Sequence, residues 1–207
     1  MPREPSGDAP PCPLCGAAGA DRFAADRRRV YHRCRSCALV FVPPALHPSV
    51  RDEKARYDRH RNSPSDAGYR AFLGRLFAPV HARLRPGSRG LDFGCGPGPT
   101  LSGLFEAAGH RVALYDPLYH PGRGVLKRRY DFVTASEVVE HLRRPAETLD
   151  LMWSLVAPGG VLGLMTQPVP EDRPFAGWWY KDDPTHLCFF SRETPRHLAA
   201  RWGAALE

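Results

Sequence analysis

The longest amphipathic segment of the chain lies between residues 66 and 84. Its apolar residues recur every three or four positions, which places them on one face of a helix: Tyr69, Phe72, Leu73, Leu76, Phe77, Val80 and Leu84. Ser65-Asp66 is a helix start signal, and Pro86-Gly87 is a stop signal. The spacing therefore predicts one helix over this segment, which Pro79 should kink or divide.

Short apolar runs alternate with helical patterns along the rest of the chain. Four runs are predicted to be strands: 90–93, 111–115, 131–136 and 161–165. Predicted helices cover about 99–108, the segment of Leu149, Met152, Trp153 and Val156 that Pro158-Gly159-Gly160 ends, and the segment of Leu198, Ala199 and Trp202. Strands that alternate with helices form a mostly parallel sheet with helices on both faces, so the predicted fold class is α/β and Rossmann-like.

Four cysteines set a different pattern in the first 42 residues. Cys12 and Cys15 form one C-x-x-C pair, Cys34 and Cys37 form a second, and 18 residues separate the pairs. Two such turns aim four sulfurs at one ion, and four thiolates leave a tetrahedral Zn²⁺ no open position. With short strands predicted over 30–33 and 39–42, this segment is typical of a zinc ribbon with a structural ion.

Two disulfides are the alternative interpretation of the four cysteines. A reducing cytosol disfavours them, and no apolar export segment follows Met1. No apolar run reaches the ~18 residues that a membrane span needs, so we expect a cytoplasmic protein with no membrane partner. A ribbon this small has almost no core, so metal binding would supply its folding free energy. The predicted boundaries are a disordered tail over 1–9, the ribbon over 10–42, a linker over 43–65 and the main domain over 66–207.

The charge of the chain is compatible with two kinds of surface, one that binds an anionic partner and one that is only solvated. The formal net charge is +7, and 26 of the 29 basic residues are Arg. This balance permits an anionic partner such as nucleic acid or a phosphorylated substrate. The basic runs are nevertheless short and interleaved with acids, which is typical of a solvated surface. Four thiolates on one Zn²⁺ would also lower the net charge to about +5.

A glycine-rich turn follows the strand predicted over 90–93. Gly94, Gly96 and Gly98 stand at alternate positions before a predicted helix, so the backbone can turn sharply and approach a ligand closely. A dinucleotide fingerprint requires Gly-x-Gly-x-x-Gly, but position 99 is Pro, and no Lys-Ser/Thr follows as in a P-loop. Asp116 ends the next strand, where an acid can accept both hydroxyls of a ribose.

Together these segments resemble the class I S-adenosylmethionine (SAM)-dependent methyltransferases. Four segments follow the order of that family: Asp92-Phe93-Gly94-Cys95-Gly96-Pro97-Gly98, Asp116, Glu137-Val138-Val139-Glu140-His141-Leu142, and Leu155 to Gly160. The segment from Asp183 to Ser191 resembles one that many small-molecule methyltransferases carry. The resemblance covers roughly residues 66–205, and the N-terminal ribbon is similar to those fused to several bacterial methyltransferases.

The resemblance implies a set of cofactor-binding residues. They are Asp92, Phe93, Gly94, Cys95, Gly96, Gly98, Asp116, Ser136 and Glu137. The three glycines would line the methionine and ribose parts of SAM, with Asp92 near the amino group and Asp116 on the ribose hydroxyls. The alternative for each aspartate is a turn or cap carboxylate.

Two departures from the family pattern bear on this prediction. Only 14 residues separate Asp116 from Asp131, where the family usually has a helix and a third strand, so the adenine pocket is expected to be shortened. The last two strands of the usual sheet are also expected to be absent, either because the chain is a truncated form or because something else covers that edge.

Two histidines are candidates for a catalytic role. His141 and His186 are the best candidate bases, with a hydrogen-bonding role as the alternative for each. His186 lies in a 171–190 insert that is rich in aromatic residues, and Trp179, Tyr180 and His186 are the candidate substrate contacts. We expect this insert to form a lid that excludes water.

The end of the strand predicted over 131–136 disfavours several acceptors. This strand ends in Thr-Ala-Ser-Glu rather than the Asn/Asp-Pro-Pro-Tyr of many amino-group methyltransferases, and no Pro-Cys nucleophile for pyrimidine C5 methylation is present. The sequence therefore favours O- or C-methylation of a small-molecule metabolite. The alternatives are a zinc-ribbon RNA methyltransferase, recognised by salt-dependent RNA binding, and a non-catalytic SAM-binding protein.

Overall fold

The computed structural model describes residues 9–59 and 63–207, and these divide into two compact units. The first, here named the cysteine unit, consists of residues 9–53, Glu140–Thr148 and Thr166–Glu207. The second, named the parallel-sheet unit, consists of Lys54–Val139 and Leu149–Met165. Most of the tail predicted over 1–9 lies outside the described residues. The domain boundaries given above stay a prediction.

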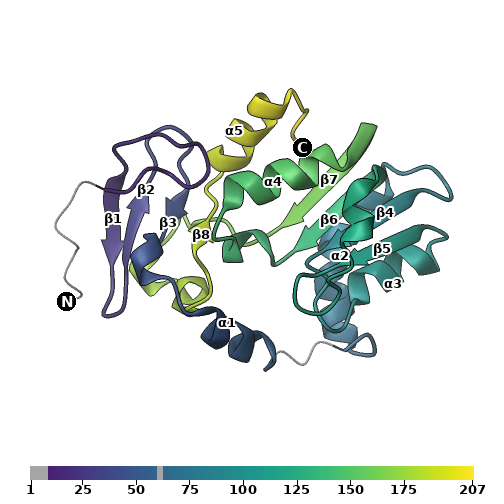
Figure 1. The fold of residues 1–207 in the computed structure, drawn as a ribbon, viewed down its shortest axis with the longest axis horizontal. Coiled ribbons are helices and arrows are strands. Elements are labelled where there is room, and N and C mark those ends of the chain that lie inside the picture. The colour runs from purple at the N-terminus through teal and green to yellow at the C-terminus, as the bar shows by residue number, and fades with distance from the viewer. Residues whose placement is uncertain (1–8, 60–62) are drawn as a thin grey trace. The chain divides into compact units, whose positions relative to one another are not determined.

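The cysteine unit contains a four-stranded antiparallel sheet in the order β1-β2-β3-β8 (Figure 1). Its strands are β1 Asp21–Ala25, β2 Val30–Arg33, β3 Val40–Phe41 and β8 Cys188–Phe189. Strands β2 and β3 lie where the sequence pattern predicts them, whereas β1 was not predicted. Phe41 pairs with Cys188, so a segment near the C-terminus completes the sheet that the first 42 residues begin.

This unit has an aromatic core of its own, which corrects the expectation of a ribbon with almost none. Its buried members are Tyr31, Val40, Val42, Val169, Phe175, Trp178, Tyr180 and Phe189. Trp178 and Tyr180 are each only 2% exposed. The aromatic insert over 171–190 therefore supplies core side chains rather than the water-excluding lid expected from the sequence. Figure 1 shows this segment beside the β1-β2-β3 strands.

The parallel-sheet unit contains four parallel strands in the order β5-β4-β6-β7 (Figure 1). They are β4 Arg89–Phe93, β5 Arg111–Tyr115, β6 Tyr130–Ser136 and β7 Val156–Met165. Residues 132–135 of β6 are all buried, so both faces of this strand are covered, as in sheets of the α/β class. The predicted α/β, Rossmann-like fold class is confirmed.

Two helices pack on one face of this sheet: α2 Ala67–His81 and α3 Thr100–Ala107. Asp66 caps α2 by accepting a hydrogen bond from the Tyr69 amide, and Pro79 lies inside the helix without dividing it. Leu73, Leu76, Val80, Leu101, Phe105 and Phe132 form the core between helices and sheet. A Cβ at Gly90 would lie 2.1 Å from the Phe132 ring, so only glycine fits beneath that ring.

Two predicted boundaries, the end of one helix and the start of the strand after it, differ from those observed. The helix α4 Pro145–Ser154 ends before Pro158-Gly159-Gly160, and β7 begins at Val156, so these three residues lie within a strand. The register of β7 against β6 is irregular there, which accommodates the proline. Between Asp116 and Asp131 the chain forms only the 3₁₀ helix η2 Arg123–Lys127, in agreement with the short spacing.

The remaining elements are short. They are η1 Pro44–Leu46 and α1 Val50–Tyr57 in the predicted linker, η3 Val139–His141, η4 Phe175–Gly177, η5 Trp179–Asp182 and α5 Glu193–Trp202. Gly203 ends α5 in the left-handed conformation, with φ +63°. Within the described ranges, no helix has both the length and the apolar character that a membrane span requires.

Candidate cofactor loop, cysteine cluster and histidine cluster

The glycine-rich loop starts at the carboxyl end of the parallel sheet. Phe93 pairs with Tyr115 and Asp92 pairs with Thr134, so β4, β5 and β6 end at the same edge. The Gly94 amide donates to the Tyr115 carbonyl over 2.7 Å, which turns the chain directly after β4. Ligands of open α/β sheets bind at this edge. The structure thus brings all nine predicted cofactor-binding residues into one unit.

Two positions in the loop differ in what a side chain would meet there. Gly94 has φ +74°, and a Cβ there would lie 2.5 Å from a Val138 methyl carbon, so the fold itself requires glycine. Gly96 has φ +65°, and nothing lies within 4 Å of the position that its Cβ would occupy. The loop therefore leaves open space beside Gly96, where a ligand can approach the backbone.

Asp116 ties this loop to the turn that follows β5. Its Oδ2 accepts from the Gly96 amide over 3.1 Å, and its Oδ1 accepts from the amides of Leu118 and Tyr119 over 2.8 and 3.0 Å. The side chain is buried, with 8% of the residue exposed. Asp116 is thus a turn carboxylate at the edge of the loop, whereas its predicted role on the ribose hydroxyls stays a prediction.

Asp92 is the buried acid beneath the loop. It is 3% exposed, and burial raises the pKa of its carboxyl to about 7. The Thr134 hydroxyl and the Ser102 amide in the first turn of α3 act in the opposite direction, and the neighbouring Asp116 raises the pKa further. A carboxyl that is costly to ionise is poised to gain from a bound cation, because an opposite charge favours ionisation.

Glu137 has a strained backbone directly after β6. Its φ is +52°, which is rare for a residue with a side chain and costs on the order of 1 kcal/mol. Its amide donates to the Met165 carbonyl over 2.8 Å, and Ser136 pairs with Met165 in the sheet. Strain of this kind clusters at functional sites, which agrees with the position predicted for Glu137 at the edge where ligands bind.

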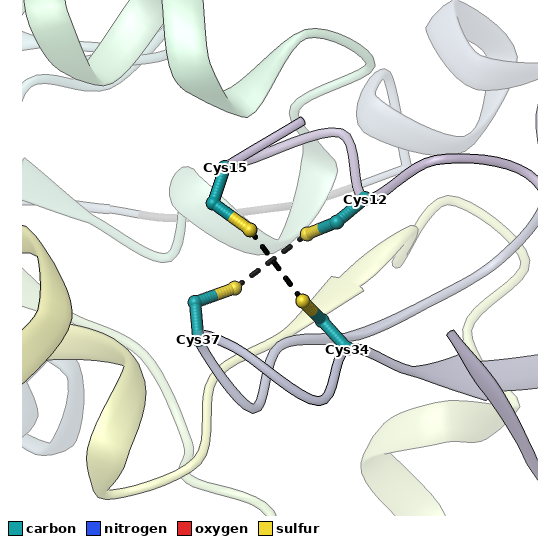
Figure 2. A group of neighbouring side chains, drawn as sticks. All are labelled: Cys12, Cys15, Cys34 and Cys37. Carbon is teal, nitrogen blue, oxygen red and sulfur yellow. Dashed lines mark hydrogen bonds between the residues drawn. The ribbon is translucent and has the colours of Figure 1, made fainter. Parts of the chain in front are cut away.

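The four N-terminal cysteines converge on one point in the cysteine unit, as Figure 2 shows. The Sγ atoms of Cys12 and Cys37 are 3.5 Å apart, as are those of Cys15 and Cys34. Sulfurs around a zinc ion lie about 3.8 Å apart, because each Zn–S bond is about 2.3 Å. All four are free thiols, so the donor set and spacing fit a tetrahedral ion and not two disulfides.

The two cysteine turns are built alike. The Gly16 amide donates to the Cys12 carbonyl over 2.9 Å, and the Ala38 amide donates to the Cys34 carbonyl over 3.0 Å. Gly16 and Ala38 both have positive φ, at +74° and +55°. The repeated geometry explains how two C-x-x-C segments present sulfurs symmetrically. Cys95 and Cys188 lie outside this cluster, and burial raises the pKa of the Cys95 thiol to about 12.

His141 and His186 meet in the cysteine unit. Their ring centroids are 4.7 Å apart, and burial, followed by the effect of His186, lowers the pKa of His141 to about 4. A neutral His141 can accept a proton at pH 7, but so low a pKa makes it a weak base. Tyr180 is buried, whereas Trp179 is 61% exposed. The catalytic and substrate roles of these residues stay predictions.

Two residues beside the histidines were not predicted as site residues. Glu140 is fully buried and accepts a hydrogen bond from the Tyr180 hydroxyl. The sequence could have indicated Glu140, because this residue stands directly before His141 in a turn after a predicted strand. The Arg29 guanidinium donates to the carbonyls of Lys181, Asp183, Pro184 and His186. These contacts span more than 150 positions, and no local pattern indicates them.

Comparison with known proteins assigns the larger part of the chain to a protein family. Residues 57–207 match a family model described as a methyltransferase domain. A search of curated proteins found no match. Among solved structures, a Bacillus halodurans C-125 protein described as a methyltransferase is 18% identical, with a TM-score of 0.52, over 66% of this chain and 70% of that chain.

A second solved structure is similar over most of both chains. It is 1,6-didemethyltoxoflavin-N1-methyltransferase from Burkholderia thailandensis, with bound 1,6-didemethyltoxoflavin and S-adenosylhomocysteine. It is 16% identical, with a TM-score of 0.52, over 91% of this chain and 90% of that chain. At these identities the two structures establish a shared fold.

Proposed function

We propose, from the premise that this chain belongs to the methyltransferase-domain family of class I SAM-dependent enzymes, that it methylates an oxygen or carbon atom of a small metabolite. The observation that carries the proposal is the loop edge of the parallel-sheet unit. There the open side of Gly96, the Asp116 carboxylate and the strained Glu137 follow three neighbouring strands. Glycine at positive φ, free space and an acid form a cradle that fits a nucleoside.

The residues of this edge have distinct roles in the proposal. Gly94 and Gly96 let the backbone approach the cofactor, and Asp116 accepts hydrogen bonds from the ribose hydroxyls while it holds the Gly96 amide. Asp92 supplies negative charge near the cofactor's amino group. SAM supplies a methyl group already activated by its sulfonium, so the protein's main task is to orient the acceptor and exclude water.

The four cysteines are proposed to hold a structural Zn²⁺. Four thiolates leave no position for a substrate, and the cluster joins both ends of the segment that carries β1 and β2. Free thiols of this kind persist in a reducing compartment, which supports the cytoplasmic location expected from the sequence.

The acceptor class is proposed from the end of β6. β6 ends in Thr134-Ala135-Ser136 before Glu137, without the Asn/Asp-Pro-Pro-Tyr of many amino-group enzymes. This supports O- or C-methylation of a small molecule. One observation favours RNA as a second candidate: a groove of about 350 Å³ in the parallel-sheet unit is lined by Arg89, Arg111 and Arg128. Three arginines around one groove suit a phosphate backbone.

Transfer of label from methyl-labelled SAM tests the proposal. We expect the zinc-loaded protein to label members of a panel of small hydroxylated and carbon-acid metabolites, and Asp116→Ala to lower that rate at least about tenfold. Total RNA forms the second arm, in which labelling that falls steeply with salt would favour the RNA candidate. A wild type that binds S-adenosylhomocysteine but labels neither arm would contradict methyl transfer and favour a binding protein.

A further inference from the structure

A second group of metal-ligand side chains lies in the cysteine unit, apart from the four cysteines. Glu140, His141 and His186 each offer one ligand atom, and these three atoms all lie within 4.8 Å of one another. The His141 Nε2 is 4.0 Å from the Glu140 Oε1. Glu140 is fully buried and His186 is 8% exposed, so this is an interior cluster and not a chance meeting of surface side chains.

Hydrogen bonds fix the tautomer of both imidazoles. The His141 Nδ1 lies 3.0 Å from the Thr185 carbonyl oxygen, and the His186 Nδ1 lies 2.7 Å from the Tyr180 carbonyl oxygen. A carbonyl only accepts, so each neutral ring carries its proton on Nδ1 and a lone pair on Nε2. Histidines that bind metals show this arrangement, in which the outer nitrogen donates to a carbonyl and the inner one faces the ion.

The Glu140 carboxylate is also positioned by a hydrogen bond. The Tyr180 hydroxyl donates to the Glu140 Oε1, and the Thr166 hydroxyl lies 3.1 Å from the Tyr180 oxygen. Tyr180 supplies a hydrogen bond but no charge. A carboxylate taken fully out of water is stable in its ionised form beside a cation, and a divalent ion would supply that charge.

The loop that carries His186 is also fixed from behind. Arg29, which is 6% exposed, donates to four carbonyls between Lys181 and His186. Asp183 accepts from both the amide and the hydroxyl of Thr185. The ring of His186 and the carbonyl that orients His141 are therefore held by the same rigid loop, as precise ligand placement requires.

We propose that Glu140, His141 and His186 bind one divalent first-row transition-metal ion, separate from the ion at the four cysteines. Two imidazole nitrogens and a carboxylate oxygen are the donors that Zn²⁺, Fe²⁺, Co²⁺ and Mn²⁺ accept. Ligands around such an ion lie about 3.3 Å apart, so binding draws the three side chains inward by less than about 1 Å each. Three protein ligands leave coordination positions for water or for an oxygen atom of a bound molecule.

Cobalt titration of the full chain tests this site without SAM or an acceptor, so its outcome is independent of the proposed methyl transfer. Protein without a polyhistidine tag is first loaded with one equivalent of Zn²⁺ at the cysteines. We expect one further equivalent of Co²⁺ to bind and give visible d–d absorption, without the near-ultraviolet charge-transfer band that thiolate ligands produce. Glu140→Gln and His186→Asn should each weaken this binding at least about tenfold, and Tyr180→Phe should weaken it by about tenfold through the lost hydrogen bond.

His197→Asn is the matched control, since it makes the same chemical change on α5 of the same unit and should leave the second equivalent unchanged. Circular dichroism of each variant separates loss of binding from loss of fold. The proposal is overturned if the folded, zinc-loaded wild type takes up no second ion. It is equally overturned if the second ion survives in folded Glu140→Gln and His186→Asn, because the ion then binds elsewhere.

Discussion

Removal of the metal from the four cysteines is expected to unfold the cysteine unit while the strands β4 to β7 stay folded. Metal binding supplies about 10 to 16 kcal/mol to small thiolate sites at neutral pH. That is as large as the whole stability of a typical domain, so the aromatic core around Tyr31 and Trp178 should not hold the unit alone. Hydrogen exchange after chelation should show at least a roughly hundredfold loss of protection in β2 and β3, with β4 and β6 unchanged.

Two cysteine variants separate this effect from general damage by the chelator. Cys34→Ser removes one ligand and should reproduce the loss of protection without any chelator. Cys95→Ser makes the same change in the parallel-sheet unit, outside the cluster, and should leave β2 and β3 protected. Protection in β2 and β3 that survives both chelation and Cys34→Ser would contradict a metal at the four cysteines.

Asp92→Asn is expected to stabilise the protein at pH 8 and to weaken its binding of S-adenosylhomocysteine. Burial raises the pKa of Asp92 from 3.8 to about 7, so the folded state holds a proton that the unfolded state releases above about pH 4. The free energy of unfolding therefore falls as pH rises from about 4 to about 7, by as much as about 4 kcal/mol. The amide side chain of Asp92→Asn has no charge to bury, so the variant does not lose this free energy of unfolding. It also has no negative charge to attract the cofactor's ammonium group.

Chemical denaturation at pH 4 and pH 8 checks the predicted direction in which the free energy of unfolding changes with pH. The gain in unfolding free energy of Asp92→Asn over wild type should be present at pH 8 and nearly absent at pH 4. Calorimetry at pH 8 should show S-adenosylhomocysteine binding about tenfold more weakly. Glu106→Gln, the same kind of change on the exposed side of α3, should alter neither quantity. A loss of stability in Asp92→Asn that is equal at both pH values would refute the assigned role of burial.

Local patterns carried most of what could be predicted. The helix expected over 66–84 is α2, because a run of apolar residues at helical spacing and the Asp66 cap are both local signals. The cysteine spacing and the glycines from Gly94 to Gly98 are equally local signals in the sequence.

Other features depend on contacts that no local pattern shows. β8 has two residues, too few for any periodicity, and it pairs with β3 from the other end of the chain. Without that pairing, Trp178 and Tyr180 resemble an exposed lid rather than a core. The Glu140, His141 and His186 cluster likewise depends on a loop that Arg29 holds from more than 150 positions away.

Calorimetric titration of S-adenosylhomocysteine into zinc-loaded protein tests the central claim most directly, with two glycine variants beside the wild type. Gly96 and Gly109 both have positive φ and open space at their Cβ positions, but only Gly96 lies in the loop proposed to bind the cofactor. We predict micromolar binding by wild type and Gly109→Ala, and at least about a tenfold loss in Gly96→Ala, whose methyl group occupies the space proposed for the ligand. No binding to folded wild type, or equal binding by all three proteins, would contradict the assignment of this loop to the cofactor.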